Sequence, residues 1–252
     1  YSTGVITATI QENDSTTLAT LTNTGTTGVI DATQDRHAYT ITITNSADAG
    51  DILSLDNVTS VSINLESLST LTGTLAEVEG VFTLDDDSKV SLGASPSVAL
   101  TLSDASIAVD QANTLASQTS GVITATIYEG TYTALNGLNE TTNNYALTLT
   151  EQISVTNVNT LQGKTVGVIT ATISNGAITD LVNLTNTQSN SNYTITITDT
   201  GSQTAANINT IKLANTSGTI TASGIATVTG TASAVISAYS AVNTGFGDEN
   251  IT

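Results

Sequence analysis

The heptapeptide Gly-Val-Ile-Thr-Ala-Thr-Ile at residues 121–127 constrains the fold more than any other feature of this chain. It occurs word for word at residues 4–10 and 167–173, and a degenerate copy begins at Gly218. The last three copies start 46 and 51 residues apart. Strand-like segments that begin with tyrosine lie between the copies and halve this period to about 24 residues. A chain with such a period is expected to stack similar units on one another.

Apolar and hydroxyl side chains alternate within each heptapeptide. This period of two is typical of a strand with one buried face. We therefore expect Ile123, Ala125 and Ile127 to face the core, together with the equivalent residues of the other copies. The tyrosine-led segments at residues 39–44, 145–150 and 193–198 show the same alternation.

These patterns predict an all-β fold, a β-solenoid resembling a parallel β-helix, with about ten coils of about 24 residues. A fold with helices between the strands is disfavoured, because no segment carries an apolar helical stripe over about 10 to 15 residues. The alternative is a tandem array of β-sandwich domains, each of which needs about 100 residues. Secondary strands are expected at residues 52–55, 153–156, 178–184 and 208–213.

The repeats predict one array over residues 1–252. Its approximate units are residues 4–60, 61–120, 121–166, 167–217 and 218–252, the last of them incomplete. Residues 80–96 interrupt the pattern and are expected to form an insertion loop. Short helical turns are expected to follow Thr74 and Thr231, which are suited to be helix N-caps.

Composition excludes several classes of function. The chain has 22 acidic and four basic residues and a formal net charge of −18, which disfavours binding to nucleic acid or to an anionic membrane. No apolar run approaches the roughly 18 residues of a membrane helix, so membrane insertion is not expected. There is no cysteine for disulfides or thiolate chemistry. The chain starts at Tyr1 and lacks methionine, so we expect a processed or partial product.

No residue pattern points to catalysis, and we predict that the protein is not an enzyme. His37 is the only histidine, and no Gly-x-Ser-x-Gly segment supplies a nucleophile for it. We interpret His37 as a residue of a surface turn. No pair of carboxylates is marked by its position in the way that polysaccharide-cleaving repeat proteins require.

The acidic run Asp85, Asp86 and Asp87 is the one candidate metal site, with calcium as the ion. Its spacing differs from that of an EF-hand, and a solvated loop tip is the simpler interpretation. No other cofactor is expected. Asp104, Asp180 and Asp199 flank strands and are interpreted as turn-forming residues.

Pairs of threonines separated by one residue alternate away from the predicted apolar face. Stacked on a flat sheet, they would form a regular array of hydroxyl groups like that of ice-binding solenoids. The simpler interpretation is that threonine, about a fifth of all residues, is a soluble residue that suits strands. The pairs begin at Thr7, Thr124, Thr148, Thr170 and Thr194.

Several segments resemble the repeats of very large secreted bacterial surface proteins. These segments are residues 71–78, residues 228–235 followed by Tyr239, residues 205–211, and residues 245–249. The nearest family is the cyanobacterial type of β-strand-repeat protein, which is loosely related to hemolysin-type calcium-binding proteins. The resemblance implies a structural or adhesive role outside the cell. The glycine-aspartate nonapeptide that binds calcium in the hemolysin type is absent here.

Together these observations predict a secreted structural protein that assembles end to end into a filament or surface layer. Its partner would be further copies of itself, joined by strand pairing. The alternative is an adhesin segment that binds calcium or glycans, and a minor alternative is an ice-binding protein. The residues expected to join neighbouring copies are Val5, Ile6, Gly245, Phe246, Ile251 and Thr252.

Overall fold

The computed structural model describes residues 6–21, 36–186, 191–243, 245–246 and 250–251. Residues 250–251 are described by their backbone alone. They belong to two compact units. The N-terminal unit covers residues 1–107 and 114–125, and the C-terminal unit covers residues 108–113 and 126–252. Helix α4 (Val109–Gln118) contributes residues to both units.

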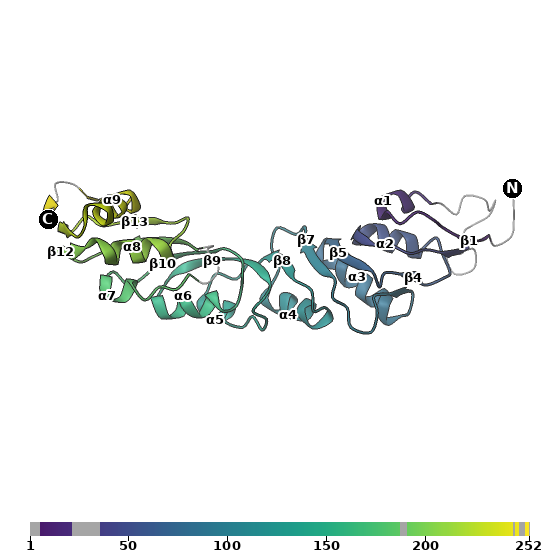
Figure 1. The fold of residues 1–252 in the computed structure, drawn as a ribbon. Helices are drawn as coiled ribbons and strands as arrows, with labels where there is room; N and C mark the ends of the chain where they lie inside the picture. The colour runs from purple at the N-terminus through teal and green to yellow at the C-terminus, as the bar shows by residue number, and fades with distance from the viewer. Residues whose placement is uncertain (1–5, 22–35, 187–190, 244, 247–249, 252) are drawn as a thin grey trace. The chain divides into compact units, whose positions relative to one another are not determined.

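The N-terminal unit alternates short strands with helices (Figure 1). Its strands are β1 (Thr7–Thr9), β2 (Ala38–Thr40), β3 (Asn45–Asp48), β4 (Ile63–Asn64), β5 (Leu68–Gly73), β6 (Val90–Ser91), β7 (Ala99–Leu102) and β8 (Ile123–Thr126). Its helices are α1 (Ser15–Leu18), α2 (Ala49–Asp56) and α3 (Leu75–Asp86).

The C-terminal unit continues the alternation. Its strands are β9 (Asn144–Ile153), β10 (Ile169–Ile173), β11 (Ser191–Thr196), β12 (Gly201–Thr204), β13 (Thr219–Thr221), β14 (Ile225–Thr229) and β15 (Asn250–Ile251). Its helices are α5 (Tyr132–Leu135), α6 (Val155–Gln162), α7 (Ile178–Leu181), α8 (Ala205–Ala214) and α9 (Ala232–Ala241).

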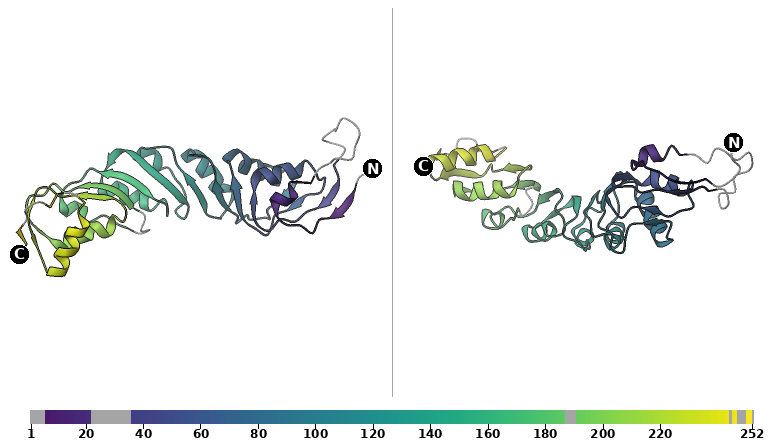
Figure 2. Two further views of the ribbon diagram at one scale, coloured as in Figure 1. Left: turned by 90° about the horizontal axis from the view of Figure 1, so that it is seen from above. Right: turned by 45° about the vertical axis from the view of Figure 1, so that its right-hand side comes forward.

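The main strands of each unit are parallel and lie side by side in chain order. In the N-terminal unit the order is β3, β5, β7 and β8, and in the C-terminal unit it is β9, β10, β11 and β13. Parallel neighbours need a crossover connection, and the helices supply it. In Figure 2 the helices of the C-terminal unit lie side by side, as do its strands. We call one strand and the helix that follows it a module.

The prediction of an all-β solenoid is wrong, because helices occupy the connections between the parallel strands. The alternative of tandem β-sandwiches is also wrong, since a sandwich is built from antiparallel strands, whereas all strand pairs in the described residues are parallel. Residues 52–55, 153–156, 178–184 and 208–213 were predicted as strands. Residues 52–55 instead lie in α2 and residues 208–213 in α8, while α6 begins within residues 153–156 and α7 covers the start of residues 178–184.

Helices such as α6 and α8 escaped prediction because each buries an apolar stripe only one residue wide. In α6 the buried apolar residues are Val155, Val158 and Leu161, three positions apart. In α8 the same spacing is followed, with two of its four buried residues being alanine. A surface helix more often buries three or four positions in every two turns. Most of the remaining positions of these two helices are threonine, asparagine or alanine, so the apolar stripe is hard to recognise in the sequence.

The predicted helix caps are confirmed. The Thr74 hydroxyl accepts a hydrogen bond from the Glu77 backbone N–H, and the Glu77 carboxylate accepts one from the Thr74 backbone N–H, which forms a capping box at the start of α3. The bond from the Thr74 backbone N–H, and one from the Thr74 hydroxyl to the same carboxylate, lower the pKa of Glu77. Thr231 caps α9 in the same way through the Ala234 N–H. The predicted insertion loop is wrong, since α3 continues to Asp86 and β6 follows it.

The predicted core face of the heptapeptides is confirmed in the second and third copies. Ile123, Ala125 and Ile127 are buried, as are the equivalent residues of the third copy. The tyrosines that begin the alternate segments, Tyr145 and Tyr193, are also buried. The first copy differs, because Ile6 remains 43% exposed.

The glycine that opens the heptapeptide marks a close approach between neighbouring modules. A Cβ atom added at Gly167 would lie 2.3 Å from the carbonyl oxygen of Tyr145. The same atom at Gly121 would lie 2.2 Å from the carbonyl oxygen of Val98. Real Cβ atoms do not come this close to backbone oxygens, so only glycine permits this spacing of the chains.

Replacing Gly167 with alanine should therefore lower stability strongly, because the backbone of one module must move away from the next. We expect a loss of about 2 kcal/mol or more, as for other overpacked sites, measured by urea unfolding. Gly163→Ala is the matched control, since its added Cβ would lie 3.3 Å from the carbonyl oxygen of Thr160. Equal unfolding midpoints for the two variants would contradict the close approach.

Candidate functional site

A buried hydroxyl joins the entry of β10 to the preceding module. The Thr165 side chain is fully buried, and its Oγ1 lies 2.8 Å from the carbonyl oxygen of Tyr145. The Thr165 Oγ1 also accepts hydrogen bonds of 2.9 Å from the backbone N–H groups of Tyr145 and Gly167. One side chain thus satisfies backbone groups where the parallel ladder has not yet begun.

The same contact recurs in both units, and we call the residues that make it clamp residues. In the N-terminal unit Thr59 binds the N–H and the carbonyl oxygen of Tyr39. Thr119 likewise binds the carbonyl oxygen of Val98. In the C-terminal unit Asn215 takes this role, with 2.9 Å bonds to the N–H and the carbonyl oxygen of Tyr193. The clamp residues are Thr59, Thr119, Thr165 and Asn215.

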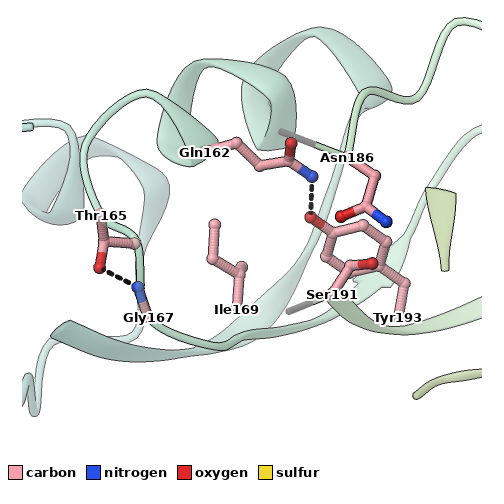
Figure 3. A pocket seen from close by; sticks show the side chains of 7 residues that line it. All are labelled: Gln162, Thr165, Gly167, Ile169, Asn186, Ser191 and Tyr193. Atoms are coloured by element: carbon pink, nitrogen blue, oxygen red, sulfur yellow. Dashed lines mark hydrogen bonds between the residues drawn. The ribbon is translucent and has the colours of Figure 1, made fainter. Parts of the chain in front are cut away.

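The clamp at Thr165 borders a small cavity in which the phenol of Tyr193 is buried (Figure 3). Gln162 donates a 2.7 Å hydrogen bond to this phenol. Burial raises the pKa of Tyr193, and it raises the pKa of Tyr145 to about 12. The cavity has a volume of about 10 Å³, room for about one water molecule. It therefore serves the packing of the core and is too small for a substrate.

Asparagines on the helices form a second set of contacts between modules. The Asn113 side chain donates to the carbonyl oxygen of Gly137 and accepts from the N–H of Asn139. The Asn159 side chain repeats both bonds one period later, with Asn183 and Thr185. Asn209 donates to the carbonyl oxygen of Ala234, again in the C-terminal unit. Asn113 and Asn159 thus hold the loop that follows the next helix, and Asn209 binds the next helix itself.

Carboxylates form a third set, at the helix N-termini. The Asp104 carboxylate accepts a hydrogen bond from the N–H of Leu75, the first residue of α3. Glu129 accepts from Val109 of α4, and Glu151 from Tyr132 of α5. The first N–H groups of a helix have no partner within the helix, and a carboxylate of the next module supplies one.

The residues interpreted as turn-forming aspartates divide between two roles. Asp104 and Asp199 each bind the start of a helix in the preceding module, Asp199 through a 2.7 Å bond from the N–H of Ile178. Asp180 accepts a bond from Asn175 five residues earlier. No local sequence pattern predicts the contacts of Asp104 and Asp199, because each of these carboxylates lies about 20 to 30 residues from its partner.

The predicted calcium ligands lie at the end of α3, and they serve local structure. Asp85 accepts a 2.7 Å hydrogen bond from the N–H of Leu92. Asp86 is the last residue of α3, and the exposed Asp87 lies 3.6 Å from the Lys89 ammonium. Within the described ranges, no group of three histidine, cysteine, aspartate or glutamate side chains is placed to hold a metal ion.

His37 is buried, so its interpretation as a residue of a surface turn is wrong. Its Nδ1 accepts a 3.1 Å hydrogen bond from the N–H of Ile6. Its ring lies 5.2 Å from the ring of Tyr39, at a tilted angle. His37 therefore connects two modules of the N-terminal unit.

The residues predicted to join neighbouring copies are only partly described. Phe246 stacks against Tyr239 with ring centroids 4.7 Å apart. Gly245 has a positive φ of 125° and lies against the backbone of the Ala222 region. Ile251 belongs to β15, which pairs with β14. Ile6 is half-exposed, and Val5 and Thr252 lie outside the described residues.

The outward threonines of the sheet form rows, but the rows are interrupted. Thr172 pairs with Thr194, and Thr194 with Thr219. On the other side of β10, the register shifts between Thr170 and Thr172, so that Thr172 meets Gln152. The uniform array expected of an ice-binding surface is therefore not continued across this sheet.

The N-terminal unit holds a larger cavity of about 260 Å³. Glu66, Gly93, Ser95 and Ser97 contribute polar groups to its lining. The Glu66 carboxylate accepts a 3.0 Å hydrogen bond from the Ser91 hydroxyl. Leu92 also lines the cavity, and its backbone N–H donates a hydrogen bond to the Asp85 carboxylate.

Replacing Thr165 with valine should cost about 1 to 3 kcal/mol in the free energy of unfolding, because two buried N–H groups lose their acceptor. Thr172→Val is the matched control, because Thr172 is exposed on a strand and its replacement should stay within about 0.5 kcal/mol of the parent. Chemical unfolding of both variants measures the difference. A similar small change for both would mean that the clamp is dispensable.

None of the helices in the described part of the chain has the length and apolarity needed to span a bilayer. Comparison with protein-family models, curated proteins and solved structures found no match for this chain.

Proposed function

We propose that this chain is a non-enzymatic structural protein of the cell exterior, whose copies join end to end into a filament or surface layer. The observation that carries the proposal is the use of its polar side chains. Thr165, Asn159 and Glu129 represent three sets of residues that bind the backbone of a neighbouring module. Side chains that an active site would need free are employed in holding one module to the next.

The modules offer a physical route for joining copies. Each strand pairs in parallel with the strand of the next module, and β15 lies at the edge of the sheet β12, β14 and β15. An edge strand presents backbone groups to which another strand can add. Phe246 and Gly245 pack this segment against the preceding module, which would hold the edge in place for a neighbouring copy.

Charge sets the conditions for assembly. Copies with a formal net charge of −18 repel one another at low ionic strength. Salt screens this repulsion beyond about 10 Å at 0.1 M. Assembly is therefore expected to increase with salt concentration.

Purified chain should form rods in electron micrographs at moderate salt, and removal of residues 245–252 should shorten or abolish them, because the edge at β15 is lost. Light scattering against salt concentration gives the same comparison in solution. Thermal unfolding of the truncated chain serves as its control, since the clamps of the earlier modules remain. Rods of unchanged length after truncation would reject joining at this edge, and no rods from the full chain would reject the proposed function.

A second candidate, an adhesin segment that binds a small polar ligand, is favoured by the cavity at Glu66. Its volume of about 260 Å³ is slightly below the roughly 300 Å³ at which sites for drug-sized molecules begin, so it suits a small ligand. The cavity adjoins the loop that Asp85 holds, where the acidic run had suggested calcium or glycan binding.

Calorimetric titration with calcium chloride, maltose and cellobiose tests this candidate. Binding heat that Glu66→Gln weakens by about tenfold or more would support the cavity, since a carboxylate that binds a ligand directly contributes more than about 1.4 kcal/mol. Glu79→Gln, at an exposed position of α3, is the control. Absence of heat with all three ligands would leave the structural function alone.

A further inference from the structure

Tyr128 is an exposed aromatic residue directly after the second heptapeptide. Its side chain is 66% exposed, whereas Tyr145 and Tyr193, which begin strand segments of the same unit, are almost fully buried. The residue that follows the heptapeptide is Gln11 in the first copy and Ser174 in the third. The repeat therefore does not require an aromatic ring at this position.

The register places Tyr128 at the end of a row of polar side chains. The N–H of Ile127 donates a 3.0 Å hydrogen bond to the carbonyl oxygen of Ala146, which places Ile127 beside Leu147. Tyr128 and Thr148 are the next residues of the two segments, and the register shifts by one residue before the Thr150 N–H donates to the carbonyl oxygen of Gly130. Thr148 pairs with Thr170, and Thr170 pairs with Asn192. Neighbouring strands lie about 4.8 Å apart, so the ring is followed by three polar side chains at regular steps.

All members of this row belong to the C-terminal unit. Thr148, Thr170 and Asn192 share one face of its sheet, and Tyr128 lies two residues after the end of β8. The residues that alternate with them, Ile127, Leu147 and Ile169, are buried on the opposite face. Thr148 is exposed, and the Asn192 amide donates a 3.3 Å hydrogen bond to the Thr170 hydroxyl. We call Tyr128, Thr148, Thr170 and Asn192 the tyrosine row.

The tyrosine row is uncharged in a chain with 22 acidic residues. A cation would find no carboxylate among these side chains, and a polyanion would be repelled by the net charge of −18. A second copy of the chain carries the same net charge and would be repelled at low salt. A neutral ligand incurs neither cost.

The chemistry of the row selects among neutral ligands. A tyrosine ring offers an apolar face and a hydroxyl group, while threonine and asparagine both donate and accept hydrogen bonds. A sugar ring has the complementary arrangement, with C–H groups on its faces and hydroxyl groups at its rim. A polysaccharide repeats this arrangement along its length, as the row does across the strands.

We propose that the tyrosine row binds a neutral polysaccharide, with Tyr128 stacked on one sugar ring and Thr148, Thr170 and Asn192 hydrogen-bonded to hydroxyl groups of the polymer. The proposal does not depend on end-to-end assembly. It gives the protein a means of attachment to a carbohydrate matrix.

Affinity electrophoresis of the full chain in native gels that contain hydroxyethylcellulose, dextran or laminarin tests the proposal at low salt. At least one of these neutral polymers should retard the protein, whereas the anionic polymer alginate should not. Tyr128→Ser, which installs the residue of the third copy, should weaken the retardation about tenfold or more, the usual effect of losing an aromatic anchor. Tyr128→Phe should retain most of it, because the ring remains.

The third copy supplies a matched gain-of-function variant. Ser174 directly follows β10, and the β10–β11 register ends at the Thr172–Thr194 pair, two residues before Ser174. Ser174 is thus the counterpart of Tyr128 in the third copy, and Ser174→Tyr should increase the retardation. Glu79→Gln, at an exposed position of α3, should leave it unchanged. No retardation by any neutral polymer, or equal retardation of the parent and Tyr128→Ser, would overturn the proposal. Neither result bears on whether the full chain forms rods.

Discussion

The structure depends on how the backbone is satisfied at the entry to each strand. At this point the chain leaves a helix. The adjacent segment of the preceding module has backbone N–H and carbonyl groups that no neighbouring strand pairs. Thr165 meets these groups from within the core, and Thr59, Thr119 and Asn215 do the same elsewhere. A buried amide or carbonyl without a partner costs as much as a lost hydrogen bond. The aliphatic core can form only because these polar groups are covered.

The acidic composition has a structural explanation once the helices are known. Asp104, Glu129, Glu151 and Asp199 each accept a hydrogen bond from the first residue of a helix in the preceding module. Helices α5 and α7 have only four residues each, too few to be stable alone. A carboxylate from the next module supplies the bonds that such short helices lack. Part of the negative charge is therefore placed where backbone donors gather, while the tyrosine row stays neutral.

Strands were easier to predict from the sequence than helices, for a physical reason. In the second heptapeptide the alternation is exact, and Ile123, Ala125 and Ile127 are buried as predicted. The buried face of a strand can be recognised from the strand's own sequence, because every second residue is apolar. A helix such as α6 buries an apolar residue only at every third position, and Ser154 and Asn175 accept the hydrogen bonds of its first turn. Its identity comes from contacts with neighbouring modules, which a local pattern does not contain.

The same limit applies to the candidate sites. Asp85, Asp86 and Asp87 stood out because they are consecutive, yet Asp85 serves the loop at Leu92. Thr165 did not stand out in a chain where about a fifth of the residues are threonine, although it holds two modules together. Tyr128 could have been noticed by aligning the heptapeptide copies, since it replaces the small or polar residue found after the others.

The pairing of each clamp with the module before it bears on how such a chain can change in length. Thr165 contacts Tyr145, and Asn215 contacts Tyr193, so every connection has its donor in one module and its acceptor in the adjacent one. A duplicated two-module block would begin with a clamp side chain and end with the backbone groups that such a side chain binds. Each border of the inserted block would therefore form a complete clamp contact. Gene duplication could thus add or remove blocks of about 50 residues without leaving a polar group exposed to the core. Length becomes a property that evolution can adjust separately from stability.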